Sequence, residues 1–374
     1  MAAPQLILLD SLDAIRAAAP AWDDLWRRSD VAVPVARAEL VAQWIEAASP
    51  QATVRGLAVR QDGQLVAALP LVGGRVKRLV RVGRLPSNYW AWAGDLLLDP
   101  SADAPPVLET LAAAVGQLPW PLLWLDAVPL QTPRWREFVA ALDAGGLASS
   151  SQQRFCIGQV EIDHDWPGYQ ARLSANHRHH MRRINNRATD DGGATLKVYR
   201  DPRPEEIDDL LRRGFAIEDR SWKGTEGSSV LQRPAHFQYY CRQARQLAEW
   251  GQLQLTFLEL AGQPIAFEYG WNARGVYFSP KVGYDDKFSR LSPGQLLRRH
   301  LLERFFADHQ QHLFDFIGPL STATAKWITG SYPVGRIVVD TGRGGGRALL
   351  RLYESWWAGL RRLRYRREAE NAKF

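Results

Sequence analysis

The clearest fold signal lies in residues 253–318, LQLTFLELAGQPIAFEYGWNARGVYFSPKVGYDDKFSRLSPGQLLRRHLLERFFADHQQHLFDFIG. Its first half contains three β-rich runs separated by the turn sequences 261–263 and 272–275, which is typical of antiparallel strands. Ser292-Pro293-Gly294 then favours a helix start, because serine is a common N-cap and proline is tolerated at the first helical position. The stretch therefore predicts three strands, a loop, a helix and a short apolar strand at 313–317.

The loop before this helix has a geometry that suits an anion. Free backbone N–H groups and the positive end of the helix dipole face whatever lies in front of a helix N-terminus. A phosphate or pyrophosphate is a common occupant of such a position. The alternative is that residues 292–294 only start a helix, since most capped helices hold no ligand.

The same order of elements occurs earlier in the chain. Between about residues 53 and 126, strand, turn, strand, strand, helix and apolar strand follow one another as they do in 253–318. The hairpin turns share letters, since Asp62-Gly63-Gln64 corresponds to Ala261-Gly262-Gln263. We therefore expect an internal duplication of one α/β unit. The predicted fold class is α/β (α+β), with tandem units that each contain a mixed, mostly antiparallel twisted sheet flanked by helices.

Length and composition indicate a folded protein of two domains, which we expect at residues 1–150 and 151–374. Hydrophobic residues make up 46% of the chain and charged residues 23%, as in ordinary globular proteins. The formal net charge of +7 favours anionic partners, which include a nucleotide cofactor, an anionic sugar, nucleic acid and a membrane surface. Charge alone does not choose among them.

Targeting signals and cysteines point to the cytoplasm. The two cysteines, Cys156 and Cys241, are too few for a disulfide framework or a cysteine metal site. The first twenty or so residues lack a basic segment and carry Asp10 and Asp13 within their apolar stretch, unlike a signal peptide. No apolar run reaches the roughly 18 residues that a membrane-spanning helix needs. We expect a cytoplasmic protein, with peripheral contact at the inner face of the membrane as an option.

Four short motifs follow one another between residues 173 and 332. They are Leu173-Ser174-x-Asn176-x-Arg178; Glu218-x-x-x-Trp222-Lys223-Gly224-x-x-Gly227-Ser228; Tyr284 followed by Leu291-Ser292-Pro293-Gly294-x-x-Leu297; and Asp315-Phe316-x-Gly318 followed by Lys326-Trp327. In this order they resemble the GNAT-type acetyltransferase domain of the CelD/BcsL-like proteins, bacterial enzymes of cellulose and exopolysaccharide formation. That family is similar in turn to the FemABX peptidoglycan transferases. Both are built from tandem GNAT-like units.

The resemblance implies acetyl-CoA, or another acyl-CoA, as co-substrate at the loop before the helix. Two strands flanking that helix would splay to admit the pantetheine arm. The loop departs from the usual glycine-rich GNAT signature, since it offers only Gly294. FemABX relatives use aminoacyl-tRNA instead. The expected cofactor-binding residues are Tyr284, Arg290, Leu291, Ser292, Pro293, Gly294 and Gln295.

Acyl transfer needs a base for the nucleophile and a donor for the developing oxyanion. Glu218, on a helix before a glycine-containing loop, is one candidate base; the alternative is a carboxylate on the helix surface. Asp315, on an apolar strand, is another, because burial would raise its pKa; the alternative is a structural partner for a buried donor. Lys326 matches the lysine that FemABX relatives place beside the reacting carbonyl, although a solvated lysine explains it equally well.

Acceptor binding is expected from a second set of residues. Trp222, Lys223 and Gly227 would shape the acceptor pocket, with Trp222 stacking on a sugar face, although tryptophan is also a common core residue. Arg178 and Arg182 would hold an anionic acceptor such as a sugar diphosphate, although a solvated basic face is the more frequent explanation. His177, His179 and His180 invite a zinc interpretation, but no further ligand cluster accompanies them, and we expect no metal.

The C-terminal residues 348–367 form an amphipathic pattern, with Leu349, Leu352, Tyr353, Trp356, Leu360 and Leu363 on one face. This basic helix would pack on its own domain or lie on an anionic membrane. No helix-turn-helix or zinc-finger pattern is present, so no specific nucleic acid is expected. The sequence thus predicts an acyl-CoA-dependent acyltransferase acting on a saccharide or cell-envelope precursor. The alternatives are a FemABX-like aminoacyltransferase and a non-catalytic scaffold of a polysaccharide-synthesis complex.

Overall fold

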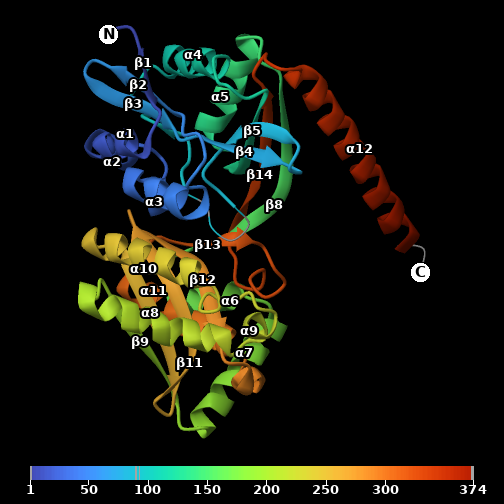
Figure 1. The fold of residues 1–374 in the computed structure, drawn as a ribbon. Helices are drawn as coiled ribbons and strands as arrows, with labels where there is room; N and C mark the ends of the chain where they lie inside the picture. The colour runs from blue at the N-terminus through green and yellow to red at the C-terminus, as the bar shows by residue number, and fades with distance from the viewer. Residues whose placement is uncertain (1, 89–90, 92, 372–374) are drawn as a thin grey trace. The chain divides into compact units, whose positions relative to one another are not determined.

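The computed structural model describes residues 2–88, 91 and 93–371, and in the last helix it describes side chains up to Gly359. The chain divides into two compact units (Figure 1). One comprises Met1–Val31, Val35–Arg154 and Pro333–Phe374, and the other comprises Ala32–Pro34 and Phe155–Tyr332. This division differs from the expected 1–150 and 151–374, because residues after 332 return to the first unit as a strand and a helix.

The first unit combines two groups of strands with helices. An antiparallel sheet has the order β1-β2-β3-β6, and a second group has the order β4-β5-β7-β14. In the second group β5 and β7 are parallel and the other neighbours are antiparallel. The elements are β1 (Gln5–Leu9), α1 (Leu12–Ala17), α2 (Ala19–Arg28), α3 (Ala38–Ala48), β2 (Gly56–Gln61), β3 (Gln64–Leu69), β4 (Val72–Val76), β5 (Val80–Arg84), β6 (Leu97–Leu98), α4 (Ala104–Val115), β7 (Leu122–Pro129), α5 (Pro133–Ala144), β14 (Gly330–Asp340) and α12 (Gly346–Asn371).

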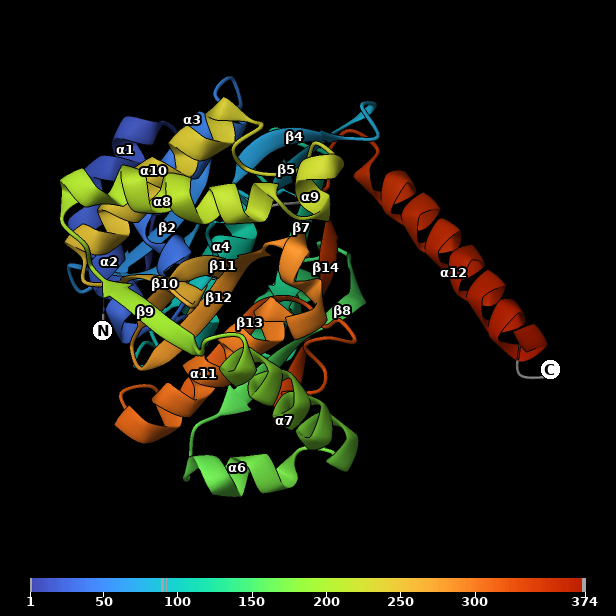
Figure 2. The ribbon, with the colours of Figure 1, turned by 90° about the horizontal axis from the view of Figure 1, so that it is seen from below.

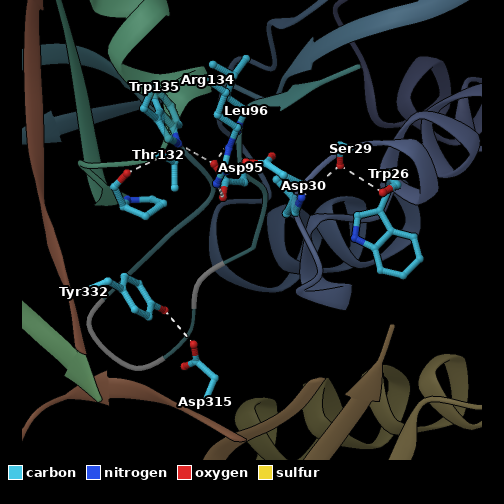
Figure 3. Close-up of polar contacts among 12 residues, drawn as sticks. Trp26, Ser29, Asp30, Asp95, Leu96, Thr132, Arg134, Trp135, Asp315 and Tyr332 are labelled. Atoms are coloured by element: carbon cyan, nitrogen blue, oxygen red, sulfur yellow. Dashed lines mark hydrogen bonds and ion pairs between the residues drawn. The ribbon is translucent and has the colours of Figure 1, made fainter. Parts of the chain in front are cut away.

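A buried carboxylate joins two parts of the first unit (Figure 3). Asp95, only 6% exposed, accepts hydrogen bonds from the indole N–H of Trp135 at 2.7 Å and from Nη2 of Arg134 at 2.8 Å. Arg134 also pairs with Asp30 at 2.7 Å. A buried charge is tolerated only when it is paired and hydrogen-bonded, as Asp95 is here. The cluster therefore holds the segments around Asp30, Asp95 and Arg134 together.

The second unit is one twisted sheet covered by helices. Its strand order is β8-β13-β12-β11-β10-β9, in which β12 and β13 are parallel and the other neighbours antiparallel. Strands β8 and β14 each pass from one unit to the other. The elements are β8 (Ser149–Glu161), α6 (Trp166–Arg172), α7 (Ala175–Asp190), β9 (Ala194–Arg200), α8 (Pro204–Asp219), α9 (Trp222–Thr225), α10 (Pro234–Glu249), β10 (Leu253–Leu260), β11 (Gln263–Ala273), β12 (Val276–Tyr284), the 3₁₀ helix η2 (Asp286–Leu291), α11 (Pro293–Asp308) and β13 (Leu313–Pro319).

Helices cover both faces of this sheet (Figure 2). Consecutive residues of a strand point to opposite faces, and β11 shows what each face contacts. Phe267 packs against Phe215 of α8, whereas its neighbour Glu268 pairs with Arg298 of α11. Helices α6, α7 and α11 contribute to the apolar core on the α11 side. The sheet is therefore buried on both faces, which explains the nearly continuous apolar runs of β10 and β11.

Several sequence expectations are confirmed and others are wrong. The fold class is confirmed, and both shared hairpin turns have positive φ at their two central residues, Asp62-Gly63 and Ala261-Gly262, as type I′ turns require. Residues 75–84, a basic segment, belong to the β4–β5 hairpin, and the sequence did not predict this hairpin. In α12, Leu350 and Tyr353 are buried while Leu352 and Trp356 are exposed. The packed face of that helix is therefore rotated from the predicted one.

Candidate functional site

The parallel strands β12 and β13 separate partway along their length. Their pairing covers Val276–Leu313, Tyr277–Phe314 and Phe278–Asp315, and it stops there although both strands continue. Helix α11 connects the two strands. The arrangement leaves an opening in the sheet with Asp315 at its closed end, which is the splayed geometry that the resemblance implies for an acyl-CoA site.

A strained loop leads from β12 into α11. Ser292 occupies the N-cap position with a left-handed backbone (φ 48°), and its side chain makes no capping hydrogen bond, contrary to expectation. Its carbonyl oxygen instead accepts from the backbone N–H groups of Gln295 at 2.8 Å and Leu296 at 3.1 Å. A non-glycine residue with positive φ is uncommon and is often found at functional sites.

The predicted cofactor-binding residues of this loop have different environments. Leu291 and Pro293 are buried, so they shape the loop from inside. Arg290 is exposed and pairs at 2.6 Å with Asp191, the C-cap residue of α7. A Cβ added at Gly294 would meet only Tyr284, at 3.6 Å, so the backbone of Gly294 has open space in front of it. The side-chain oxygen Oε1 of Gln295 accepts from the indole N–H of Trp327 at 2.7 Å.

Asp315 is the buried carboxylate at the closed end of the opening. Its Oδ2 atom accepts from the side-chain amide of Gln159 at 2.9 Å and from the hydroxyl of Tyr332 at 3.1 Å, which points at it in Figure 3. Its Oδ1 atom accepts from the backbone N–H of Ile317 at 2.7 Å. Burial raises the pKa of Asp315 to about 6, despite the hydrogen bonds that oppose the shift.

The strand is distorted directly after Asp315. Ile317 has a φ of 55°, and the register of β13 against β8 shifts between Asp315 and Pro319. A β-branched residue in the left-handed region is a genuine outlier that costs about 1–3 kcal/mol. The hydrogen bond from Ile317 to the Asp315 carboxylate holds this bulge in place, and bulges of this kind are over-represented beside active sites.

Glu218, the other predicted base, lies in a buried charge cluster. Its Oε1 atom is 2.7 Å from Nζ of Lys223 and 3.3 Å from Nζ of Lys281, and Oε2 accepts from the backbone N–H of Val230 at 3.2 Å. Burial lowers the pKa of Lys223, and Lys281 adds to this effect against the pull of Glu218. With two ammonium groups and an N–H on its oxygens, Glu218 is better suited to fix the following loop than to accept a proton.

The loop after Glu218 carries the predicted acceptor-binding residues. The carbonyl oxygen of Lys223 accepts from the backbone N–H groups of Ser228 at 2.8 Å and Ser229 at 3.1 Å, so the loop folds around this lysine. Gly227 has a φ of 67°, which a turn of this shape requires. Trp222 is 48% exposed. An exposed indole on a fixed loop is available to stack on an acceptor.

Residues on either side of Lys326 contact the first turn of α11, because Ala323 and Trp327 both hydrogen-bond to Gln295. Lys326 is exposed, whereas the adjacent Trp327 is 1% exposed and contacts His177 edge-to-face at 4.5 Å between ring centroids. Burial lowers the pKa of His177 to about 4, and Lys326 and His180 add to the effect. The structure thus brings Lys326 near α7 and keeps His177 neutral near pH 7. Among the described residues, no cluster of three or more His, Cys, Asp or Glu side chains could hold a metal ion.

Arg178 and Arg182, the predicted anion-binding residues, line one pocket of about 260 Å³ on the α11 side of the sheet. Arg299 of α11 and the indoles of Trp166 and Trp327 also line it. Sequence reasoning missed Gln159, Tyr332, Lys281, Arg299 and Trp166. Only contacts between distant segments place these residues, although an alternating strand pattern around Gln159 could have been found.

Comparison with known protein families finds a match within the second unit. The family model of the acetyltransferase (GNAT) domain matches residues 175–327. This match confirms the predicted enzyme class, an acyltransferase. No curated protein sequence matches the chain.

Solved structures with low sequence identity share the fold across both units. FemX is 12% identical with a TM-score of 0.55, and the match covers 85% of this chain and 94% of FemX. The C-terminal domain of a putative lysylphosphatidylglycerol synthetase from Agrobacterium fabrum is 14% identical with a TM-score of 0.53. The match covers 91% of this chain and 96% of that domain. L-PGS from Bacillus licheniformis is 14% identical with a TM-score of 0.50, and the match covers 89% of this chain and 94% of L-PGS. These likenesses establish the fold and leave the choice between acyl-CoA and aminoacyl-tRNA open.

The described residues include no helix that is long and apolar enough to cross a membrane.

Proposed function

We propose that the protein transfers an acyl group, most simply acetyl, from acyl-CoA to an amino or hydroxyl group of a saccharide or cell-envelope precursor. The observation that carries the proposal is the opening between β12 and β13, which ends at Asp315 and lies beside the helix N-terminus at Gly294. An acyl donor with a long arm and a pyrophosphate fits such a site, because the arm can complete the open strand edges while backbone N–H groups face the phosphates. A CelD/BcsL-like role in exopolysaccharide formation belongs to this proposal.

The residues at the closed end supply the proton transfer. Bound acyl-CoA would supply a thioester whose carbonyl carbon forms the new bond to the nucleophile; its C–S bond would then break, and coenzyme A would leave as a thiolate that takes up a proton from solvent. Tyr332 oxygen takes the proton of the attacking amine or hydroxyl as its own hydroxyl proton passes to Oδ2 of Asp315. A carboxylate with a pKa of about 6 is ionised at neutral pH and ready for this role. Lys326, exposed and adjacent to Trp327, which hydrogen-bonds to the first turn of α11, steadies the oxyanion.

The remaining predicted residues position the acceptor. The cluster of Glu218, Lys223 and Lys281 fixes the loop that carries Trp222. Stacking of a sugar face on the exposed indole of Trp222 would orient a saccharide acceptor. Glu218 is therefore a positioning residue in this mechanism, and Asp315 is the base.

Aminoacyl transfer from tRNA is the second candidate, favoured by the shared fold with FemX. Both donors present an activated acyl carbonyl, so the same base could serve either. A non-catalytic scaffold is the third candidate. Salt-sensitive tRNA binding distinguishes the second from the others.

A thermal-shift titration of the full chain tests the donor. Acetyl-CoA, longer acyl-CoAs, free coenzyme A and total tRNA are titrated separately, since a ligand that binds only the native state raises the melting temperature. We expect a saturable shift with acyl-CoA in wild type and in Asp315→Asn, because the carboxylate acts on the nucleophile. No shift with any coenzyme A species, in a protein shown to be folded, would overturn the proposal; a shift with tRNA would then support the second candidate.

A further inference from the structure

The pocket between α6, α7 and α11 is positively charged. Its lining includes Arg178, Arg182 and Arg299 and no acidic residue. Arg182 is exposed, and Nε of Arg299 is buried without a hydrogen-bond partner among the described residues. The nearest recorded carboxylate, Glu303, lies 3.9 Å from Nη2 of Arg299, too far for a hydrogen bond. The pocket thus offers two guanidinium groups with unused donors, a setting that favours a phosphate.

The two indoles of the pocket are held in place by their surroundings. Trp327 is fixed by its hydrogen bond to Gln295 and by the edge of His177. Trp166 packs near the rings of Tyr169 and Phe306, with centroids 5.5 and 5.9 Å away. Trp327 is 1% exposed and Trp166 is half-buried, so Trp166 is the indole on which a nucleobase would stack beside the arginines.

The pocket also lies next to the proposed donor site. Gln295, which bonds Trp327, belongs to the first turn of α11, and Arg299 lies one turn further along the same helix. We propose that this pocket binds the phosphorylated adenosine portion of the acyl donor. The proposal rests on the proposed function. Coenzyme A carries a 3′-phosphoadenosine, and aminoacyl-tRNA ends in an adenosine nucleotide, so the ligand chemistry is shared by both donors.

Calorimetric titration of the full chain with adenosine 3′,5′-bisphosphate, coenzyme A, dephospho-coenzyme A and a tRNA acceptor minihelix tests this site. Arg182→Gln and Arg299→Gln should each weaken binding of the bisphosphate about tenfold, as expected for a lost charge-assisted hydrogen bond. Arg183→Gln is the matched control, because Arg183 is exposed on the same helix and does not line the pocket. Arg178 is left unchanged, since it donates to the carbonyl oxygens of Ala171 and Leu173 and supports the end of α6.

The ligand series identifies the source of the nucleotide. If wild type binds coenzyme A more tightly than dephospho-coenzyme A, and the two pocket variants do not, the nucleotide belongs to the coenzyme. Minihelix binding that depends on Arg182 and Arg299 points to tRNA. Coenzyme A binding that is equally tight in wild type, Arg182→Gln and Arg299→Gln would overturn the pocket proposal and leave the proposed function standing. Loss of binding in Arg183→Gln as well would also overturn it, since a diffuse basic surface would then suffice.

A second surface, in the first unit, rests on independent observations. The turn between β4 and β5 carries Lys77, Arg78 and Leu79, and Leu79 is 81% exposed. Nζ of Lys77 lies 4.8 Å from the ring centroid of Trp356 on α12, which is 46% exposed. Leu352, one helical turn before Trp356, is 67% exposed. Exposed apolar side chains therefore occur on two elements that contact each other through Lys77 and Trp356.

The exposed charges around these apolar side chains are mostly positive. Cations on the β4–β5 hairpin and on residues 346–359 of α12 are Arg75, Lys77, Arg78, Arg81, Arg347 and Arg351, and the acidic residue in that part of α12 is Glu354. The geometry points to docking of this surface on an anionic lipid bilayer, with Leu79 and Trp356 entering the headgroup region. Apolar side chains flanked by cations bind anionic membranes through both burial and charge.

Co-sedimentation of the full chain with vesicles tests this surface. Vesicles of phosphatidylcholine with one third phosphatidylglycerol should bind wild type, and phosphatidylcholine alone should bind it at least tenfold more weakly. Leu79→Ser and Trp356→Ser should each reduce binding to the anionic vesicles about fivefold, because each removes a buried apolar group. Leu8→Ser is the matched control, since Leu8 is 49% exposed on β1. Equal binding by all variants, or no vesicle binding, would overturn membrane docking.

Discussion

The hydroxyl of Tyr332 donates a hydrogen bond to Oδ2 of Asp315 across 3.1 Å, at the point where β12 and β13 part. Asp315 is 3% exposed, while Tyr332 is only half-buried. A proton can therefore leave an acceptor at the tyrosine and arrive at a carboxylate that solvent hardly reaches. This pair gives the site a route for a proton that does not require the carboxylate to touch the substrate.

Asp315→Asn should lower turnover about 10²- to 10⁴-fold, because it removes the group that finally holds the proton. Tyr332→Phe should lower turnover as well, while the affinity for acyl-CoA stays within about twofold in both. Steady-state kinetics with a thiol-release assay measures the effect. Glu259→Gln serves as a control, since Glu259 is a buried carboxylate on β10 of the same sheet. Turnover that survives Asp315→Asn would remove this residue from the mechanism.

The pH dependence of activity and of stability should have opposite signs. In the proposed mechanism the base is ionised Asp315, so kcat/KM should rise with pH through about 6. The folded state holds the Asp315 proton more tightly than the unfolded chain, whose carboxyl has a pKa near 3.8. The contribution of Asp315 to the free energy of unfolding is therefore fully present below pH 3.8 and is lost as the pH rises through about 6. Urea midpoints of wild type should fall relative to Asp315→Asn over this window; parallel curves would contradict the shift.

Lys223→Met should destabilise the protein by about 3 kcal/mol, the lower end for a broken buried ion pair, because Lys281 still contacts Glu218. Trp222→Ala, at the neighbouring exposed position, should leave stability within about 0.5 kcal/mol. Chemical denaturation of both variants measures the difference. If the two substitutions cost the same, the buried charge cluster does not fix the loop.

Gly283→Ala should cost about 1–3 kcal/mol, since the new Cβ would lie 2.6 Å from Cβ and 2.8 Å from Cα of Glu218. The close approach lets β12 and α8 bring Lys281 and Glu218 together. Gly330→Ala is the control, because nothing lies within 4 Å of its added Cβ. A melting temperature that falls equally for both substitutions would contradict the packing argument.

Lys326→Met should lower turnover much more than it lowers affinity for acyl-CoA, because an oxyanion forms only during the reaction. Lys326 is exposed, so the substitution should not affect folding. Comparing kcat with the dissociation constant from calorimetry separates the two effects. Unchanged turnover would exclude Lys326 from the mechanism.

Local patterns predicted more of the fold than of the site. The turn letters at Asp62-Gly63 and Ala261-Gly262 specify backbone conformation directly, and the apolar run around Asp315 shows that this carboxylate is buried. By contrast, Lys281 reaches Glu218 through the packing of α8 on β12, and Tyr332 reaches Asp315 from a separate strand. No local pattern specifies either contact. Glu218 is a candidate base by its sequence and a positioning residue in the proposed mechanism. The reason is its cationic neighbour Lys281, which lies 63 positions away in the sequence.

The passage of β8 and β14 between the units has a consequence for synthesis on the ribosome. Strand β14 pairs with β7 through residues 334–340, so the first unit lacks a central strand until residue 340 has been made. The second unit, apart from residues 32–34, is continuous from 155 to 332 and is complete earlier. The first unit, whose residues up to 154 are made before the second unit, thus completes its fold after the second unit. Until β14 arrives, the exposed edge of β7 is open to pairing with other chains.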